Sequence, residues 1–160
     1  MNIYNEEYFK DKLRYESKKI HYREIISFAY KLNAKSVLDV GCGNGVMISK
    51  LLKGRNIKAI GMDFSEYAGS LIPNNFILAD ATKKFPFEDD TFDLVTSSDF
   101  FEHIEEKDID FVYSEMRRVG KNVSAVISPK KDIGHLTIHK KQWWLDKLPG
   151  IIIINKFNLK

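Results

Sequence analysis

The chain has 160 residues, of which 44% are hydrophobic and 29% are charged, and its formal net charge is +3. This balance is typical of a globular domain and excludes a disordered or fibrous chain, and the length predicts a single domain with a substantial core. The single cysteine, Cys42, excludes an internal disulfide and a zinc site built from several cysteines.

Hydrophobic periodicity predicts helices and strands that alternate along the chain. Residues 5–32 carry apolar side chains at helical spacing. Short apolar runs predict strands at residues 36–40, 57–62, 75–79, 92–97, 123–128 and 151–157. Helical spacing returns between strands and predicts helices at residues 46–52, 105–119 and 140–148. Because the strands are almost continuously apolar, the pattern favours an α/β fold with a mostly parallel sheet covered by helices on both faces.

Acidic residues recur where these strands end. Asp63, Asp80 and Asp99 lie at or just past the ends of three strands, and Asp39 lies in the last turn of the first strand. In parallel sheets, ligands bind at the carboxyl ends of the strands. Since an unpaired carboxylate at a buried edge is costly, we expect these four side chains to serve a ligand rather than packing.

The sequence VLDVGCGNG joins the first strand to the helix at residues 46–52. Gly41, Gly43 and Gly45 let the backbone approach a ligand closely, and the free N–H groups at the start of the helix point to the same place. Asp63 follows Gly43 by twenty residues, where a carboxylate is well placed to bind two ribose hydroxyls. The loop therefore predicts a ligand that contains a nucleoside.

The same loop disfavours two common nucleotide sites. A P-loop needs Gly-Lys followed by Ser or Thr, and the chain has no such triplet. The dinucleotide fingerprint needs a glycine where this chain has Val46, which argues against a nicotinamide-dependent reductase. Asp39, just before the glycines, would repel a pyrophosphate and suits a cationic amine. A ribose together with an ammonium group describes S-adenosylmethionine.

VLDVGCGNG resembles the first motif of the class I S-adenosylmethionine-dependent methyltransferases. Three later segments resemble further motifs of that family in the same order. They are the ribose site at Asp63-Phe64, the adenine site at Asp80-Ala81-Thr82, and the segment FPFEDDTFDLVTSSDFFEHI through the fourth strand. The resemblance covers residues 36–128, which is most of the chain.

This resemblance implies a three-layer α/β/α Rossmann-like methyltransferase fold in a single domain over residues 1–160. The core would occupy residues 34–160, and residues 1–33 would form a helical lid. The family usually has seven strands, whereas the residues after 148 provide for one, so we expect a sheet truncated at the C-terminus with about six strands. Candidate lid side chains are Tyr8, Phe9, Arg14 and Tyr15.

The resemblance also implies which residues bind S-adenosylmethionine. Asp63 would bind the ribose hydroxyls, Asp80 the adenine amine, and Asp39 the amino group or the loop itself. Phe64 would pack beside the adenine, and Cys42 would be a small packing residue within the loop. The complete predicted cofactor site is Asp39, Gly41, Cys42, Gly43, Gly45, Asp63, Phe64, Asp80, Ala81 and Ser97.

Asp99, near the end of the fourth strand, and His103, just past that strand, are the candidate catalytic residues. His103 would act as general base for an acceptor hydroxyl. Asp99, Glu102 and His103 together with His135 or His139 also resemble the metal site of metal-assisted relatives, such as small-RNA 2′-O-methyltransferases and ubiquinone-pathway O-methyltransferases. Those proteins have Glu where this chain has Asp99, so metal dependence stays open and we assign no metal ligand.

We expect a methyltransferase that transfers a methyl group from S-adenosylmethionine to a small-molecule or anionic acceptor by in-line displacement. Between Arg117 and Lys160 there are ten Lys/Arg and two Asp/Glu, which favours an anionic acceptor and keeps RNA as a candidate, although a solvated lysine surface is the alternative. Two other functions stay open. One is a non-catalytic S-adenosylmethionine-binding subunit that supports a partner, and the other is a metal-assisted O-methyltransferase of RNA or a small molecule.

The sequence shows no signal peptide and no membrane-spanning run, so we expect a cytoplasmic protein with no membrane partner. The longest apolar run near either end is residues 151–154. Because uncovered apolar edge strands tend to find partners, this run is a candidate homodimer contact.

Overall fold

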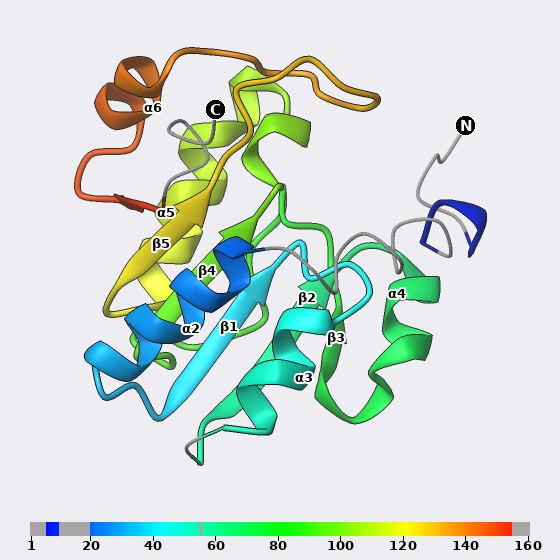
Figure 1. The fold of residues 1–160 in the computed structure, drawn as a ribbon. Helices are drawn as coiled ribbons and strands as arrows, with labels where there is room; N and C mark the ends of the chain where they lie inside the picture. The colour runs from blue at the N-terminus through cyan, green and yellow to red at the C-terminus, as the bar shows by residue number, and fades with distance from the viewer. Residues whose placement is uncertain (1–5, 10–19, 55, 155–160) are drawn as a thin grey trace.

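The computed structural model describes residues 6–9, 20–54 and 56–154. Within them, six strands form one all-parallel sheet in the order β3-β2-β1-β4-β5-β6 (Figure 1). The strands are β1 (Ser36–Val40), β2 (Lys58–Asp63), β3 (Phe76–Leu78), β4 (Leu94–Ser98), β5 (Val123–Val126) and β6 (Ile152–Ile153). The expected α/β fold with about six strands is therefore confirmed. Arg14, Tyr15 and residues 155–157 of the expected last strand lie outside the described residues.

The strand order reverses at β1, which lies between β2 and β4. The chain builds outward from β1 through β2 to β3 on one side, and from β4 through β5 to β6 on the other. In the register of this sheet, Val40 at the end of β1 pairs with Met62 on β2 and with Ser97 on β4. The carboxyl ends of the three central strands are therefore level, which opens the crevice where ligands of such sheets bind.

Five helices are described with full bounds, and they pack on the two faces of the sheet. They are α2 (Ile20–Lys31), α3 (Val46–Leu52), α4 (Glu66–Leu71), α5 (Ile109–Val119) and α6 (Lys141–Lys147). In Figure 1, α2 and α3 lie in front of the sheet and α5 lies behind it. None of the described helices has the length and apolar character needed to span a bilayer.

Two hydrophobic clusters fill the spaces between these layers. Alternate residues of a strand point to opposite faces, so neighbours on β1 belong to different clusters. Val37 belongs to the cluster that contains Ile25 and Ile48 of the front helices, whereas Leu38 belongs to the cluster that contains Met116 of α5 and Trp144 of α6. This burial on both faces explains why the strands read as continuous apolar runs.

Helix α4 was not predicted, because its six residues EYAGSL carry too few apolar side chains for a periodic signal. Its N-cap is Ser65, whose hydroxyl accepts a hydrogen bond from the N–H of Ala68 at 3.4 Å. Both Ser65 and Ala68 are buried. The helix begins at Glu66, three residues after the end of β2, so it fixes the direction in which the chain leaves β2 at the edge of the crevice.

A charged pair on α5 fastens the segment after β3 to the back of the sheet. The Glu115 carboxylate accepts hydrogen bonds from the N–H of Phe85 at 2.7 Å and from Arg118 at 2.7 Å. Arg118 in turn donates to the carbonyl oxygens of Phe85 and Phe87, at 3.1 and 2.8 Å. The Arg118 guanidinium holds the pKa of Glu115 below its ordinary value, so the carboxylate is ionised at neutral pH.

We therefore expect Glu115→Gln to lower the free energy of unfolding by about 2 kcal/mol at pH 7, since the amide loses charge-assisted hydrogen bonds in a mostly buried position. Urea unfolding at pH 7 measures this, with the exposed Glu88→Gln as control. A carboxyl with a lowered folded-state pKa stabilises the fold above its unfolded pKa, and this stability is lost as the pH falls through the folded value. The difference in the free energy of unfolding between wild type and Glu115→Gln should accordingly become smaller in acid. A difference that does not change with pH would contradict this account.

Candidate functional site

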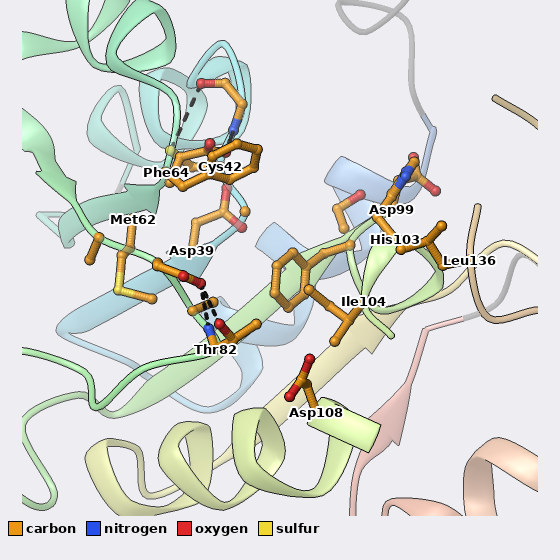
Figure 2. A pocket seen from close by; sticks show the side chains of 18 of the residues that line it. Asp39, Cys42, Met62, Phe64, Thr82, Asp99, His103, Ile104, Asp108 and Leu136 are labelled. Carbon is orange, nitrogen blue, oxygen red and sulfur yellow. Dashed lines mark hydrogen bonds between the residues drawn. The ribbon is translucent and has the colours of Figure 1, made fainter. Parts of the chain in front are cut away.

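A cavity of about 450 Å³ lies at the carboxyl edge of the sheet, where the strand order reverses. Figure 2 shows that its labelled side chains fall into two groups that face each other. One group comes from the ends of β1 and β2 and the segment after β3, and includes Asp39, Cys42, Phe64 and Thr82. The other comes from the segment after β4 and includes Asp99, His103, Ile104 and Asp108, with Leu136 from the β5–α6 connection.

The glycine loop closes the end of β1 against β2. The N–H groups of Gly41 and Cys42 both donate to the carbonyl oxygen of Met62, at 2.8 and 3.2 Å. Gly41 has a φ of 71°, and a Cβ there would overlap the ring of Phe100. The left-handed backbone and the close ring both require glycine at this position.

Gly45 has the same requirement at the other end of the loop. It is the N-cap of α3 with a φ of 68°, and a Cβ there would lie 2.5 Å from Ile72 Cγ2. The loop therefore turns from strand to helix with its backbone against the cavity.

Asp63, the last residue of β2, joins this loop to the start of α4. Its carboxylate accepts hydrogen bonds from the N–H of Gly43 and the N–H of Ser65, both at 3.0 Å. Burial raises the pKa of Asp63 above its ordinary value, and the two backbone N–H groups offset part of that effect. A buried carboxylate that lines a cavity and already accepts two N–H groups is suited to bind hydroxyl groups with its remaining lone pairs.

Two further acids of the strand ends also line the cavity. Asp39 on β1 is buried, with 3% of its surface exposed. Asp80, two residues after β3, is exposed and accepts hydrogen bonds from the N–H and hydroxyl of Thr82, at 2.8 and 2.7 Å. The half-buried Ala81 and the exposed Phe64 complete this wall.

Two predicted cofactor residues do not line the cavity directly. Gly45 is set back at the start of α3, and Ser97 is fully buried within β4. The next residue, Ser98, lines the cavity instead, and its buried hydroxyl has no hydrogen-bond partner among the described residues. Alternation along a strand explains the difference, because a one-residue shift moves the side chain to the other face.

Both predicted catalytic residues line the cavity on the side opposite Asp63. Asp99, directly after β4, has a φ of 54°, a left-handed conformation that Asp adopts more readily than most residues but that still carries strain. His103 lies in a short 3-10 helix (Phe101–His103). Its Nδ1 lies 2.9 Å from the carbonyl oxygen of Gly134. Since a carbonyl only accepts, Nδ1 carries the proton and Nε2 is the basic nitrogen.

The structure also brings together a cluster that the sequence only hinted at. Glu102, His103 and His135 each offer one atom that could bind a metal ion, and these three atoms all lie within 4.8 Å of one another. The Glu102 carboxylate is buried and accepts from the N–H of Ser128 at 2.9 Å, and His135 Nδ1 lies 2.6 Å from the carbonyl oxygen of Lys130. Both histidines therefore direct a proton at a backbone carbonyl, as metal-ligating histidines do.

The other residues considered for this cluster do not belong to it. Asp99 does not belong to the group of residues whose potential metal-ligand atoms lie within 4.8 Å of one another. His139 stacks on Trp143, with ring centroids 3.8 Å apart, and its Nε2 lies 3.2 Å from a carboxylate oxygen of Glu106.

The sequence reasoning missed several cavity residues, namely Tyr22, Phe100, Ile104, Glu105, Asp108 and Leu136. Phe100 and Ile104 lie beside predicted residues and would follow from the position of the fourth strand. Leu136 comes from a connection with no recognisable motif, so no local signal identifies it. Tyr8 and Phe9 of the expected lid do line the cavity, and Phe9 stacks on Tyr67 with ring centroids 5.9 Å apart.

Comparisons with known proteins agree with this geometry. A family model described as a methyltransferase domain matches residues 37–122, more than half of the chain. A SAM-dependent methyltransferase from Archaeoglobus fulgidus has a similar structure, with a TM-score of 0.70 and 23% identity over 88% of this chain and 72% of that one. No curated protein matches the chain.

Two other similar structures are longer than this chain. A protein from Pyrococcus horikoshii OT3 has a TM-score of 0.51 and 31% identity over 66% of this chain and 56% of its own. The cyclase SpnF has a TM-score of 0.60 and 21% identity over 71% of this chain and 48% of its own. The chain thus spans about half the length of these two proteins. One of them is a [4+2]-cyclase, so the fold alone does not define the reaction.

Proposed function

Because this chain belongs to the family of class I S-adenosylmethionine-dependent methyltransferase domains, we propose that its cavity binds S-adenosylmethionine and that the methyl group passes to an acceptor beside His103. The observation that carries the proposal is the composition of one cavity. The glycine loop, Asp39, Asp63 and Asp80 line one side of it, and the catalytic candidates line the other.

The residues on the first side fit such a ligand. A cavity of about 450 Å³ is within the size range of small-molecule sites. The Asp63 carboxylate would hold the ribose hydroxyls, and the buried Asp39 would offset the positive charge of the amino group. Asp80 and the backbone of Ala81 would recognise the adenine edge, with Phe64 covering its face.

When bound, S-adenosylmethionine supplies a methyl group on a sulfonium that is already a good leaving group. The protein's contribution is then to align the acceptor and exclude water, and alignment alone is worth roughly 7–11 kcal/mol of the barrier. The apolar side chains of Phe100, Ile104 and Leu136 would exclude water around the acceptor. His103 Nε2 would take the proton from an acceptor hydroxyl, a contribution of about 10²–10⁴-fold.

A metal-assisted reaction is the second candidate, and the cluster of Glu102, His103 and His135 favours it. One carboxylate and two imidazoles are a donor set that suits divalent transition metals such as Mn²⁺. An ion held there would act as a Lewis acid beside the acceptor side of the cavity. Under this alternative His103 would be a ligand rather than a base.

We expect isothermal titration calorimetry to show binding of S-adenosylmethionine and no binding of NADH, because the loop lacks the third glycine of a dinucleotide site. A second step then incubates the purified chain with methyl-labelled S-adenosylmethionine and panels of acceptors, including hydroxylated small molecules, anionic metabolites and RNA. Release of S-adenosylhomocysteine with label on one acceptor class supports the enzyme. Binding without transfer to any class would instead support the non-catalytic subunit, and preference for NADH would refute the assignment.

A further inference from the structure

The connection between β5 and α6, residues 129–140, presents exposed aliphatic side chains, of which only Leu136 has a role in the proposed reaction. In Figure 1 it is the long yellow-to-orange loop that extends above the carboxyl edge of the sheet. Three aliphatic side chains on it are exposed, Ile133 at 77%, Leu136 at 62% and Ile138 at 36%. Loops usually present polar residues to water, so three exposed aliphatic side chains within six residues indicate a contact surface.

The loop is held in this orientation by polar contacts on its inner side. The N–H groups of Leu136 and Thr137 donate to the carbonyl oxygen of Glu102, at 2.7 and 3.1 Å, and the Thr137 hydroxyl donates to the carbonyl oxygen of Ile104 at 2.7 Å. Thr137 is buried while its neighbours Leu136 and Ile138 are exposed. This alternation turns the two aliphatic side chains to the same outer side of an extended segment.

Exposed lysines flank the aliphatic side chains along the loop. Lys130, Lys131 and Lys140 are exposed, and their ammonium groups form no ion pair with a described residue. The single acid of the loop, Asp132, accepts a hydrogen bond from the N–H of Ile133 at 2.8 Å. The loop therefore combines protruding aliphatic side chains with a net positive charge.

We propose that this apolar-basic loop, residues 129–140, docks on the surface of an anionic lipid bilayer. Aliphatic side chains that enter the interface and lysines that attract acidic headgroups are the two contributions that together bind a surface segment to such a membrane. A single-stranded nucleic acid fits less well, because such sites rely on aromatic side chains for stacking and this loop has no Phe, Tyr or Trp.

Docking in this way would orient the cavity. Leu136 belongs both to the exposed loop surface and to the cavity wall, so the bilayer would lie next to the acceptor side of the cavity. The earlier expectation of no membrane partner rested on the lack of a spanning segment. Surface docking needs no such segment, since it draws on apolar side chains in the interface together with electrostatic attraction to anionic lipids.

The test is co-sedimentation of the purified chain with phosphatidylcholine vesicles that contain or lack 30% phosphatidylglycerol, a composition on the order of anionic membranes. We expect binding only to the anionic vesicles, weakening with salt. Lys130→Gln/Lys131→Gln should weaken it by about 30-fold, and Ile133→Ser by about 10-fold. The matched controls, Lys53→Gln/Lys58→Gln and Leu52→Ser, change exposed residues near the opposite edge of the sheet and should bind as wild type.

Three results would overturn the proposal. They are no binding to anionic vesicles, equal weakening by the loop and control variants, or binding of a single-stranded oligonucleotide through the same lysines without vesicle binding. S-adenosylmethionine titration of the same samples reports separately on the proposed function. A chain that binds vesicles but not this compound retains the docking surface and loses the proposed reaction.

Discussion

Replacing Asp63 by alanine should weaken S-adenosylmethionine binding by at least about 100-fold. The substitution removes two hydrogen bonds that the carboxylate would make to the ribose, each worth about 1.5–3 kcal/mol when one partner is charged. It also frees the N–H groups of Gly43 and Ser65, which the carboxylate holds at 3.0 Å, and so loosens the glycine loop. Isothermal titration calorimetry of wild type and variant measures the loss.

Asp93 provides a matched control at the opposite edge of the sheet. Its carboxylate also accepts two backbone N–H groups, from Lys35 at 2.8 Å and from Ser36 at 3.2 Å, but it lies before β4 and away from the cavity. Asp93→Ala should therefore lower thermal stability without changing cofactor affinity. Equal losses of affinity in the two variants would mean that Asp63 acts through the fold alone.

The pH dependence of binding is a second readout on Asp63. Burial raises its pKa, so the carboxylate that binds hydroxyls is lost in acid at a higher pH than for an exposed aspartate. The sign for stability is opposite, because the folded chain holds this proton more tightly than the unfolded chain, and protonation of Asp63 then favours the fold. Cofactor affinity that decreases toward acid while the fold persists would distinguish these two effects.

Much of this site follows from local sequence because it lies on regular elements. A continuous apolar run followed by an acid places that acid at the carboxyl edge of a parallel sheet, and Asp39, Asp63, Asp80 and Asp99 all line the cavity. The helix at residues 46–52 matches its prediction because glycines precede it and Gly54 follows it. Each of these features is predicted from a few neighbouring residues, and the parallel sheet then brings the ends of its strands together at one site.

The choice that the sequence left open, between His135 and His139, depends on contacts between distant segments. His135 joins Glu102 and His103 because the β5–α6 connection folds back and its N–H groups bind the carbonyl of Glu102. His139, equally close in sequence, instead bonds to Glu106. No periodicity distinguishes these two histidines, since the difference arises from the path of an irregular loop.

His103→Asn should lower the turnover of any acceptor found by the labelling screen by about 10²–10⁴-fold. Asparagine places an amide N–H near the position of Nδ1, so it keeps a donor for the carbonyl of Gly134, which now lies 2.9 Å away. It removes Nε2, the atom that would take a proton or bind a metal. The affinity for S-adenosylmethionine should stay within a few-fold of wild type, because His103 lies on the acceptor side of the cavity.

His135→Asn and a chelator separate the two roles of His103. If His103 acts as base, turnover survives both His135→Asn and excess EDTA. If the cluster holds a cation, both treatments abolish turnover, Mn²⁺ restores it in the wild type, and calorimetry detects Mn²⁺ binding that either variant removes without any acceptor present. If His103 only anchors the loop at Gly134, its asparagine variant keeps full turnover, because the donor is retained while the basic nitrogen is lost. That last result would remove His103 from the chemistry under either mechanism.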